Sequence, residues 1–159
     1  MKMNGQAFEG PNEAILVLPR NGQDLVFKAR AVLDYSEFDT LCPSPKPKKI
    51  KTPQGEEKSL FTEPTYLQAI DHWGKQKMAY TVIKSLVATI WLEWEKVKLD
   101  DPTTWLSYQQ EFRDAFFSER EINRIVNCCW EANSIDEDKL QEARARFLAS
   151  QVQASSTPD

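Results

Sequence analysis

The sequence predicts an α+β fold, mostly α, in which an N-terminal β-hairpin with a short helix precedes a bundle of about four helices. Three observations predict it. Asn21-Gly22 separates two β-rich runs, which is the strongest short signal for a hairpin. Beyond residue 63 the apolar residues recur at helical spacing, and Ser118 with Glu121 has the pattern of a capping box that opens a helix.

The composition is that of a single domain and argues against several classes of protein. The chain has 159 residues, of which 41% are hydrophobic and 11% aromatic, enough to build a core. Its formal net charge of -4 gives no general attraction to nucleic acid or to an anionic membrane. No run approaches the ~18 apolar residues of a membrane span, and no secretory signal is visible. The adjacent Cys128 and Cys129 favour reduced, buried thiols over a disulfide.

The first part of the chain is predicted to contain the β-structure. Residues 1–12 are polar and contain glycine, so we expect an irregular lead-in. Residues 13–42 are expected to form the hairpin and the short helix. The run 14–18 is β-rich and the run 24–30 alternates apolar and polar side chains; after them, apolar residues fall at helical spacing until Cys42-Pro43.

Residues 43–63 have a different character, because four prolines are mixed with five lysines and few side chains could enter a core. Proline favours an extended path, so we predict a long, basic, proline-rich loop. Its lysines could contact phosphates, although a solvated loop is the commoner explanation for such a run.

Residues 64–150 are predicted to be helical and to form one domain with residues 13–42. Pro64 suits the first turn of a long helix that runs to about Thr89. Asp101-Pro102 opens the next helix, with the aspartate as its cap.

Two capping boxes are predicted further along the chain. Ser118 with Glu121 opens one helix, and Ser134 with Glu137 could open the last one. Residues 151–159 are expected to form a polar tail.

Residues suited to catalysis are scarce. His72 is the only histidine, and no nucleophile-elbow pattern surrounds a serine. The glycines form neither a phosphate-binding loop nor a dinucleotide motif. The acidic run 136–138 lacks the alternating ligands and central glycine of a calcium loop. We therefore expect a binding protein and not an enzyme, with no catalytic residue, no cofactor and no metal ligand.

The aromatic residues of the helical half are more numerous than helical periodicity explains. Phe117 directly follows another phenylalanine, so the two point in different directions on a helix, and Trp130 lies off the apolar stripe of its helix. Trp91 and Trp94 lie in a segment of ambiguous structure. Either all of these side chains belong to a thick core, or these four are exposed anchors for a partner, because aromatics are enriched at binding hot spots.

Two segments carry a resemblance to a known family. The first, FKARAVLDYSEF, covers residues 27–38 and continues to LCPSP at residues 41–45. The second, FSEREINRIV, covers residues 117–126 and continues to EANS at residues 131–134. Both resemble the tail assembly chaperones of tailed bacteriophages, and the similarity spans roughly Phe27 to Gln151.

The resemblance implies a role in virion assembly. Such chaperones are late proteins that are absent from the finished virion and coat the long, hydrophobic tape measure protein before the tail tube polymerises around it. They act in the cytoplasm of the infected bacterial host. The implied partner is the tape measure protein, with the tail tube protein and a second copy of the chain as further candidates; neither a membrane nor nucleic acid is expected. These chaperones are often made in two lengths by ribosomal frameshifting, and the polar tail 151–159 suits the short form.

Two other functions stay open at this point. A small structural tail or head-completion protein of the virion would keep its interface buried permanently. A nucleic-acid-binding regulator would use the lysines between Lys46 and Lys58, but that stretch lacks interleaved aromatic residues and the chain is acidic overall. Recognition of a helix in a groove needs apolar anchors and no catalytic groups, so the chaperone role is expected first.

Overall fold

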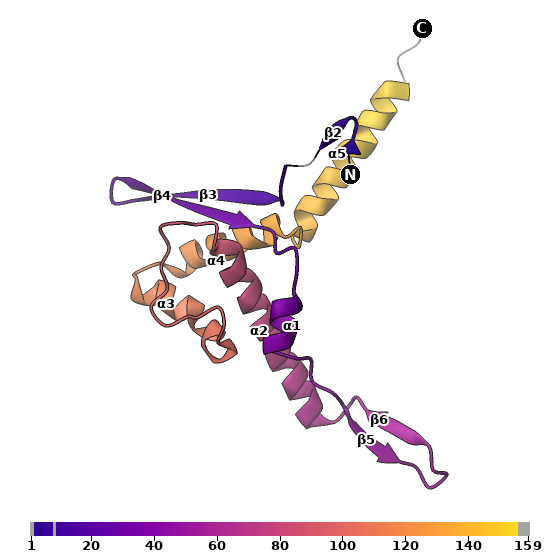
Figure 1. The fold of residues 1–159 in the computed structure, drawn as a ribbon. Coiled ribbons are helices and arrows are strands. Elements are labelled where there is room, and N and C mark those ends of the chain that lie inside the picture. Colours follow the sequence, from indigo (N-terminus) through magenta and orange to yellow (C-terminus); the bar gives the residue numbers. More distant parts are fainter. Residues whose placement is uncertain (1, 8, 156–159) are drawn as a thin grey trace.

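The computed structural model describes residues 2–7 and 9–155 (Figure 1). The predicted fold class is confirmed: the fold is mixed α+β and mostly helical, with about 49% helix and 18% strand, and hairpins precede the main helices. No helix in the described ranges is long and apolar enough to cross a membrane.

The predicted hairpin consists of β3 (Glu13–Arg20) and β4 (Gln23–Arg30), which pair antiparallel in continuous register. The turn between them places Asn21 at φ 50° and Gly22 at φ 79°, the left-handed values that a two-residue hairpin turn requires. Because side chains alternate along a strand, one face of the hairpin carries the buried Leu18, Phe27 and Ala29.

Two helices cover that face. The long helix α2 (Pro64–Leu86) contacts β4, and α4 (Glu119–Ala132) contacts both strands. Only the second half of α2 is buried, from Ala79 onward, and α4 contributes a buried stripe that includes Ile125 and Cys129. The predicted start of α2 at Pro64 and the capping box between Ser118 and Glu121 are confirmed.

A second part of the core forms around the short helix α1 (Ser36–Leu41). Its Phe38 is fully buried, with its ring centroid 5.4 Å from that of Tyr80 on α2 and 5.7 Å from that of Trp105. Trp105 lies on a 3-10 turn, η1 (Pro102–Ser107), which Asp101 caps as predicted and which continues into α3 (Tyr108–Asp114). This cluster joins α1, α2 and η1 beside the hairpin.

Asn133, at the end of α4, ties the hairpin to the helices. Its side-chain oxygen accepts a hydrogen bond from the Val32 amide at 2.8 Å, and its side-chain nitrogen donates to Ser85 Oγ at 2.8 Å. From the strand side, Asn12 donates to the Ala132 carbonyl at 2.8 Å. Each of these bonds joins segments far apart in the sequence, so the hairpin and the two main helices form one body.

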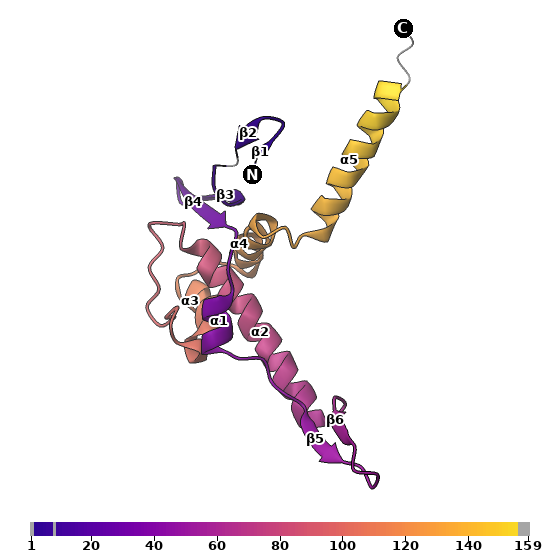
Figure 2. The ribbon, with the colours of Figure 1, turned by 45° about the vertical axis from the view of Figure 1, so that its right-hand side comes forward.

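Two predicted irregular segments are in fact hairpins. The lead-in 1–12 contains β1 (Lys2–Met3) and β2 (Gln6–Ala7), and the proline-rich loop 43–63 contains β5 (Lys48–Lys51) and β6 (Glu57–Leu60). The prediction of an irregular lead-in and of a continuous loop was wrong because Asn4-Gly5 and Gln54-Gly55 act as turns that bring short polar strands together. The pair β5–β6 extends from the N-terminal end of α2 as a separate arm (Figures 1 and 2).

The last helix also departs from the prediction. Helix α5 (Glu137–Ser155) does not join a bundle; its described side chains are exposed, and it extends away from the body in both views (Figures 1 and 2). It also continues into the predicted tail 151–159, of which residues 156–159 lie outside the described residues.

Ser134 does not cap α5, contrary to the prediction. It has φ 56°, and it ends α4: the Ser134 amide donates to the Glu131 carbonyl at 3.1 Å, and the next amide donates to the Trp130 carbonyl at 2.9 Å. Asp136 accepts a hydrogen bond from the Lys139 amide at 3.2 Å and takes the capping position instead.

Replacing Gly22 with valine should lower the free energy of unfolding by at least ~1 kcal/mol, because a β-branched residue is strained at this positive φ. Urea unfolding followed by circular dichroism would measure the change. An unchanged midpoint would show that the turn does not hold the left-handed conformation.

Replacing Gly74 with alanine should instead raise the free energy of unfolding. Gly74 lies inside α2, and apart from its chain neighbours and the backbone of its own helix no heavy atom lies within 4 Å of the Cβ that the substitution would add. Alanine favours the helix by up to ~1 kcal/mol over glycine, so the melting temperature should rise. A fall in the melting temperature would mean that another part of the chain lies closer to Gly74 than the structure indicates.

Candidate partner-binding site

The segment that follows α2 is attached to the edge of the hairpin. The hydroxyl of the buried Thr89 accepts a hydrogen bond from the Lys28 amide and donates one to the Lys28 carbonyl, each at 2.9 Å. Two residues on, the indole nitrogen of Trp91 donates to the Val26 carbonyl at 2.7 Å. These bonds satisfy backbone groups of β4 that have no neighbouring strand, and they fix the position of the Trp91 ring.

The same segment is attached a second time, to α3. The carboxylate of Glu111 accepts hydrogen bonds from the amides of Glu95 at 2.9 Å and Val97 at 3.4 Å, and from the Lys96 amide between them. The Lys96 ammonium pairs with Asp114 at 3.0 Å. The pKa of the Asp114 carboxyl is held below its ordinary value because Gln110 donates a hydrogen bond to it and because Lys96 is close.

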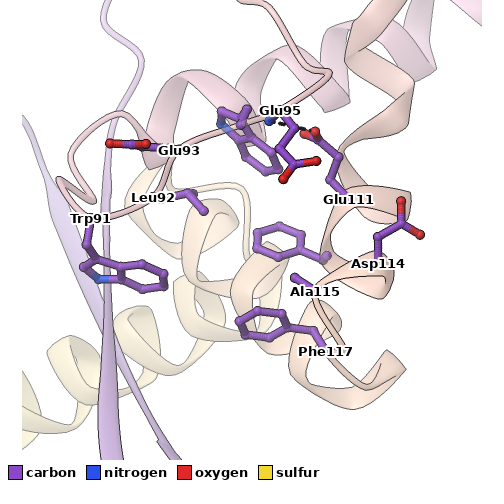
Figure 3. Close-up of a pocket in the computed structure, with 10 residues that line it drawn as sticks. Trp91, Leu92, Glu93, Glu95, Glu111, Asp114, Ala115 and Phe117 are labelled. Atoms are coloured by element: carbon purple, nitrogen blue, oxygen red, sulfur yellow. Dashed lines mark hydrogen bonds between the residues drawn. The ribbon is translucent and has the colours of Figure 1, made fainter.

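A pocket of about 350 Å³ lies between this segment and α3 (Figure 3). Four aromatic side chains surround it: Trp91 and Trp94 from the segment after α2, Phe112 from α3, and Phe117 from the turn that follows α3. Leu92 adds an aliphatic side chain. The Phe112 ring lies 5.2 Å from the Trp94 ring and 5.3 Å from the Phe117 ring, edge to face in each case. The full lining is Trp91, Leu92, Glu93, Trp94, Glu95, Glu111, Phe112, Asp114, Ala115 and Phe117.

Phe27 of the hairpin supports the pocket from behind. It is fully buried, and its ring centroid lies 4.9 Å from that of Trp91, 6.2 Å from that of Phe112 and 6.0 Å from that of Phe117. The Phe117 ring is also covered by Arg20, whose guanidinium carbon lies 4.4 Å from the ring centroid. The aromatic walls are therefore held by rigid neighbours.

The pocket is acidic as well as aromatic. Glu111 and Asp114 are engaged in the bonds that hold the segment. Glu93 and Glu95 are exposed, and among the described contacts their carboxylates have no hydrogen-bond or ion-pair partner. An apolar side chain between the rings and a cation near these two carboxylates would both be accommodated.

The structure brings three of the four predicted anchor residues together. Trp91 is 44% exposed, and Trp94 and Phe117 are half-buried; all three line the pocket. Trp130 is half-buried on α4 and does not line it. Phe112 was missed by sequence reasoning because its place in the apolar stripe of α3 marks it only as core.

The described part of the chain shows no second site of recognisable chemistry. It contains no group of three or more His, Cys, Asp or Glu residues placed to hold a metal ion. His72 is exposed on α2. Burial raises the pKa of the thiols of Cys42, Cys128 and Cys129, which disfavours the reactive thiolate.

Comparison of the chain with protein-family models, with curated proteins and with solved structures finds no match in any of the three. The chemistry of the site is therefore inferred from its geometry and from the segments that form it.

Replacing Glu111 with alanine should loosen the pocket wall. Three consecutive amides lose their acceptor, which should cost about 1 to 2 kcal/mol of unfolding free energy and change the fluorescence of Trp94. Asp71→Ala is a matched control, because it removes an exposed carboxylate that pairs only with Lys75 on the same helix, a pair worth less than about 0.5 kcal/mol. Equal effects of the two substitutions would contradict the role assigned to Glu111.

Proposed function

We propose that this chain is a tail assembly chaperone that binds the tape measure protein of a tailed bacteriophage and keeps it in solution during tail assembly. The observation that carries the proposal is the aromatic pocket beside α3. One of its walls, Phe117, begins the second segment that resembles this family. Phe27, which begins the first segment, packs against that wall, with its ring centroid 6.0 Å from that of Phe117.

The chemistry of the pocket suits such a partner. A tape measure protein that has not yet been enclosed in a tube offers long amphipathic helices without neighbours. Helix-in-groove recognition inserts one or two large apolar side chains of the helix into an apolar depression. A pocket of about 350 Å³ is at the small end of the usual range for binding sites of ~300–1,000 Å³, so it suits an anchor side chain better than a whole helix.

A single small pocket also suits transient binding. The tape measure protein has to leave its chaperone when the tube polymerises around it, so each contact should be weak and repeated along the client. Interfaces much smaller than ~1,200 Å² are typical of weak, short-lived complexes. The pocket presents rings and carboxylates, which bind, and this supports a binding role over an enzymatic one.

A structural tail or head-completion protein remains the second candidate, and a different surface favours it. The outer face of the β3–β4 hairpin exposes Ile15, Val17 and Val26, which are neighbours in the register. In a virion component this face would be buried permanently against another subunit.

The proposal predicts that co-expression with a tape measure protein keeps that protein soluble and that the two co-purify. Trp91→Ala should weaken the complex by ~1 to 3 kcal/mol with the fold intact, because it removes an exposed pocket wall. Trp130→Ala is the matched control, since it removes a half-buried tryptophan outside the pocket and should leave binding unchanged. Binding would be measured by pull-down and the fold by circular dichroism.

A third tryptophan serves as the reference for the loss of a core residue. Trp105 is fully buried, so Trp105→Ala should cost ~3 to 5 kcal/mol of stability and unfold the protein. If Trp91→Ala behaves like Trp105→Ala, Trp91 is a core residue and not an anchor. If the wild type does not hold a tape measure protein in solution and is found in purified virions, the structural role replaces the chaperone role.

A further inference from the structure

Helix α5 is an exposed arm with an apolar stripe. Leu140, Phe147 and Leu148 are exposed, Phe147 to 60%, and they stand at positions i, i+7 and i+8 on one side of the helix. Arg144, at position i+4, lies on the same side. The base of the arm is held by the turn at Ser134 and by an ion pair of 2.5 Å between Lys139 and Glu131 of α4.

The stripe on α5 is complementary to the aromatic pocket in apolar character and in charge. The stripe presents a phenyl ring with a guanidinium one helical turn away, and the lining of the pocket combines aromatic walls with the exposed residues Glu93 and Glu95. Among the described residues neither these carboxylates nor Arg144 has an ion-pair partner. Arg146, on the opposite face of α5, is already within 3.9 Å of Glu142.

The arm does not approach the pocket of its own chain. In both views α5 leads away from α3 and from the segment after α2 that forms the pocket (Figures 1 and 2). At ~1.5 Å for each residue, a helix of 19 residues reaches about 28 Å beyond the body. A second copy is therefore the occupant that this geometry favours.

We propose that α5 of one copy docks into the aromatic pocket of a second copy, with Phe147 between the rings and Arg144 beside Glu93 and Glu95. The two surfaces are different, so the contact is head-to-tail, and each docked pair keeps one free pocket and one free arm. Such contacts close into rings or extend into filaments, depending on the rotation between copies. The arm and a tape measure helix would occupy the same pocket and so would compete for it, but the self-association does not require a tape measure protein.

Analytical ultracentrifugation of the full-length protein, with no tape measure protein present, tests the proposal. The average molar mass of the wild type should rise with protein concentration. Phe147→Ala and Arg144→Glu should each weaken self-association at least roughly 10-fold. Arg146→Glu is the matched control, because it reverses the same charge on the opposite face of the arm and should leave the mass unchanged. All three side chains are exposed, so circular dichroism should show an unchanged fold.

A mixing experiment separates head-to-tail docking from pairing between two α5 helices. The double variant Glu93→Lys, Glu95→Lys reverses the charge of the pocket. Like Phe147→Ala, it should be monomeric at concentrations at which the wild type begins to associate. Mixed together, they should form a complex of one copy of each and nothing larger, because only one intact pocket and one intact arm remain. Glu56→Lys, on the exposed β5–β6 turn, controls for the change in charge.

Three outcomes would overturn the proposal. The first is a wild type that stays monomeric at millimolar concentration. The second is a pocket variant that associates as strongly as the wild type, which would indicate pairing of one α5 with another. The third is a mixture of the two variants in which no complex forms.

Discussion

The packing of Phe27 is the interaction on which the rest of the site depends. A two-stranded hairpin cannot bury its own apolar face, so its central ring must find cover from other elements. Phe27 finds it in Trp91, Phe112 and Phe117, which belong to three separate parts of the helical half. The ring that completes the core on one side therefore also packs against three of the aromatic side chains that line the pocket.

Hydrogen bonds to β4 and α3 hold the irregular segment after α2 in place as a wall of the pocket. The stretch after α2 has little regular hydrogen bonding of its own, and its amides must be satisfied by other groups. Thr89 and Trp91 bond to the free edge of β4, and Glu111 collects three successive amides from the other side. Because both attachments are to regular elements, the exposed Trp91 and Trp94 are held in place before any partner arrives, and this lowers the entropic cost of binding.

The body is compact around its aromatic clusters, and two arms, β5–β6 and α5, extend from it (Figure 2). Most side chains of these arms are exposed, and they include both charged and apolar residues. The apolar side chains on these arms add little to folding stability, because they stay exposed to water. Such exposure is typical of proteins that act through other chains. The two proposals above use the same pocket, because each places an apolar side chain of a helix between its rings.

The sequence by itself determined the features that depend on neighbours a few residues apart. Asn21-Gly22 predicted the β3–β4 hairpin, Pro64 the start of α2, and Ser118 with Glu121 the start of α4, because turns and caps are local interactions. It also singled out Trp91, Trp94, Phe117 and Trp130, since these rings do not fit a helical stripe. Only the tertiary structure decided that the first three share a pocket without Trp130, that Phe112 and Glu111 complete it, and that α5 stands apart from the core. These facts rest on contacts between segments far apart in the chain, such as Phe27 with Phe117 and Lys28 with Thr89, which no local pattern encodes.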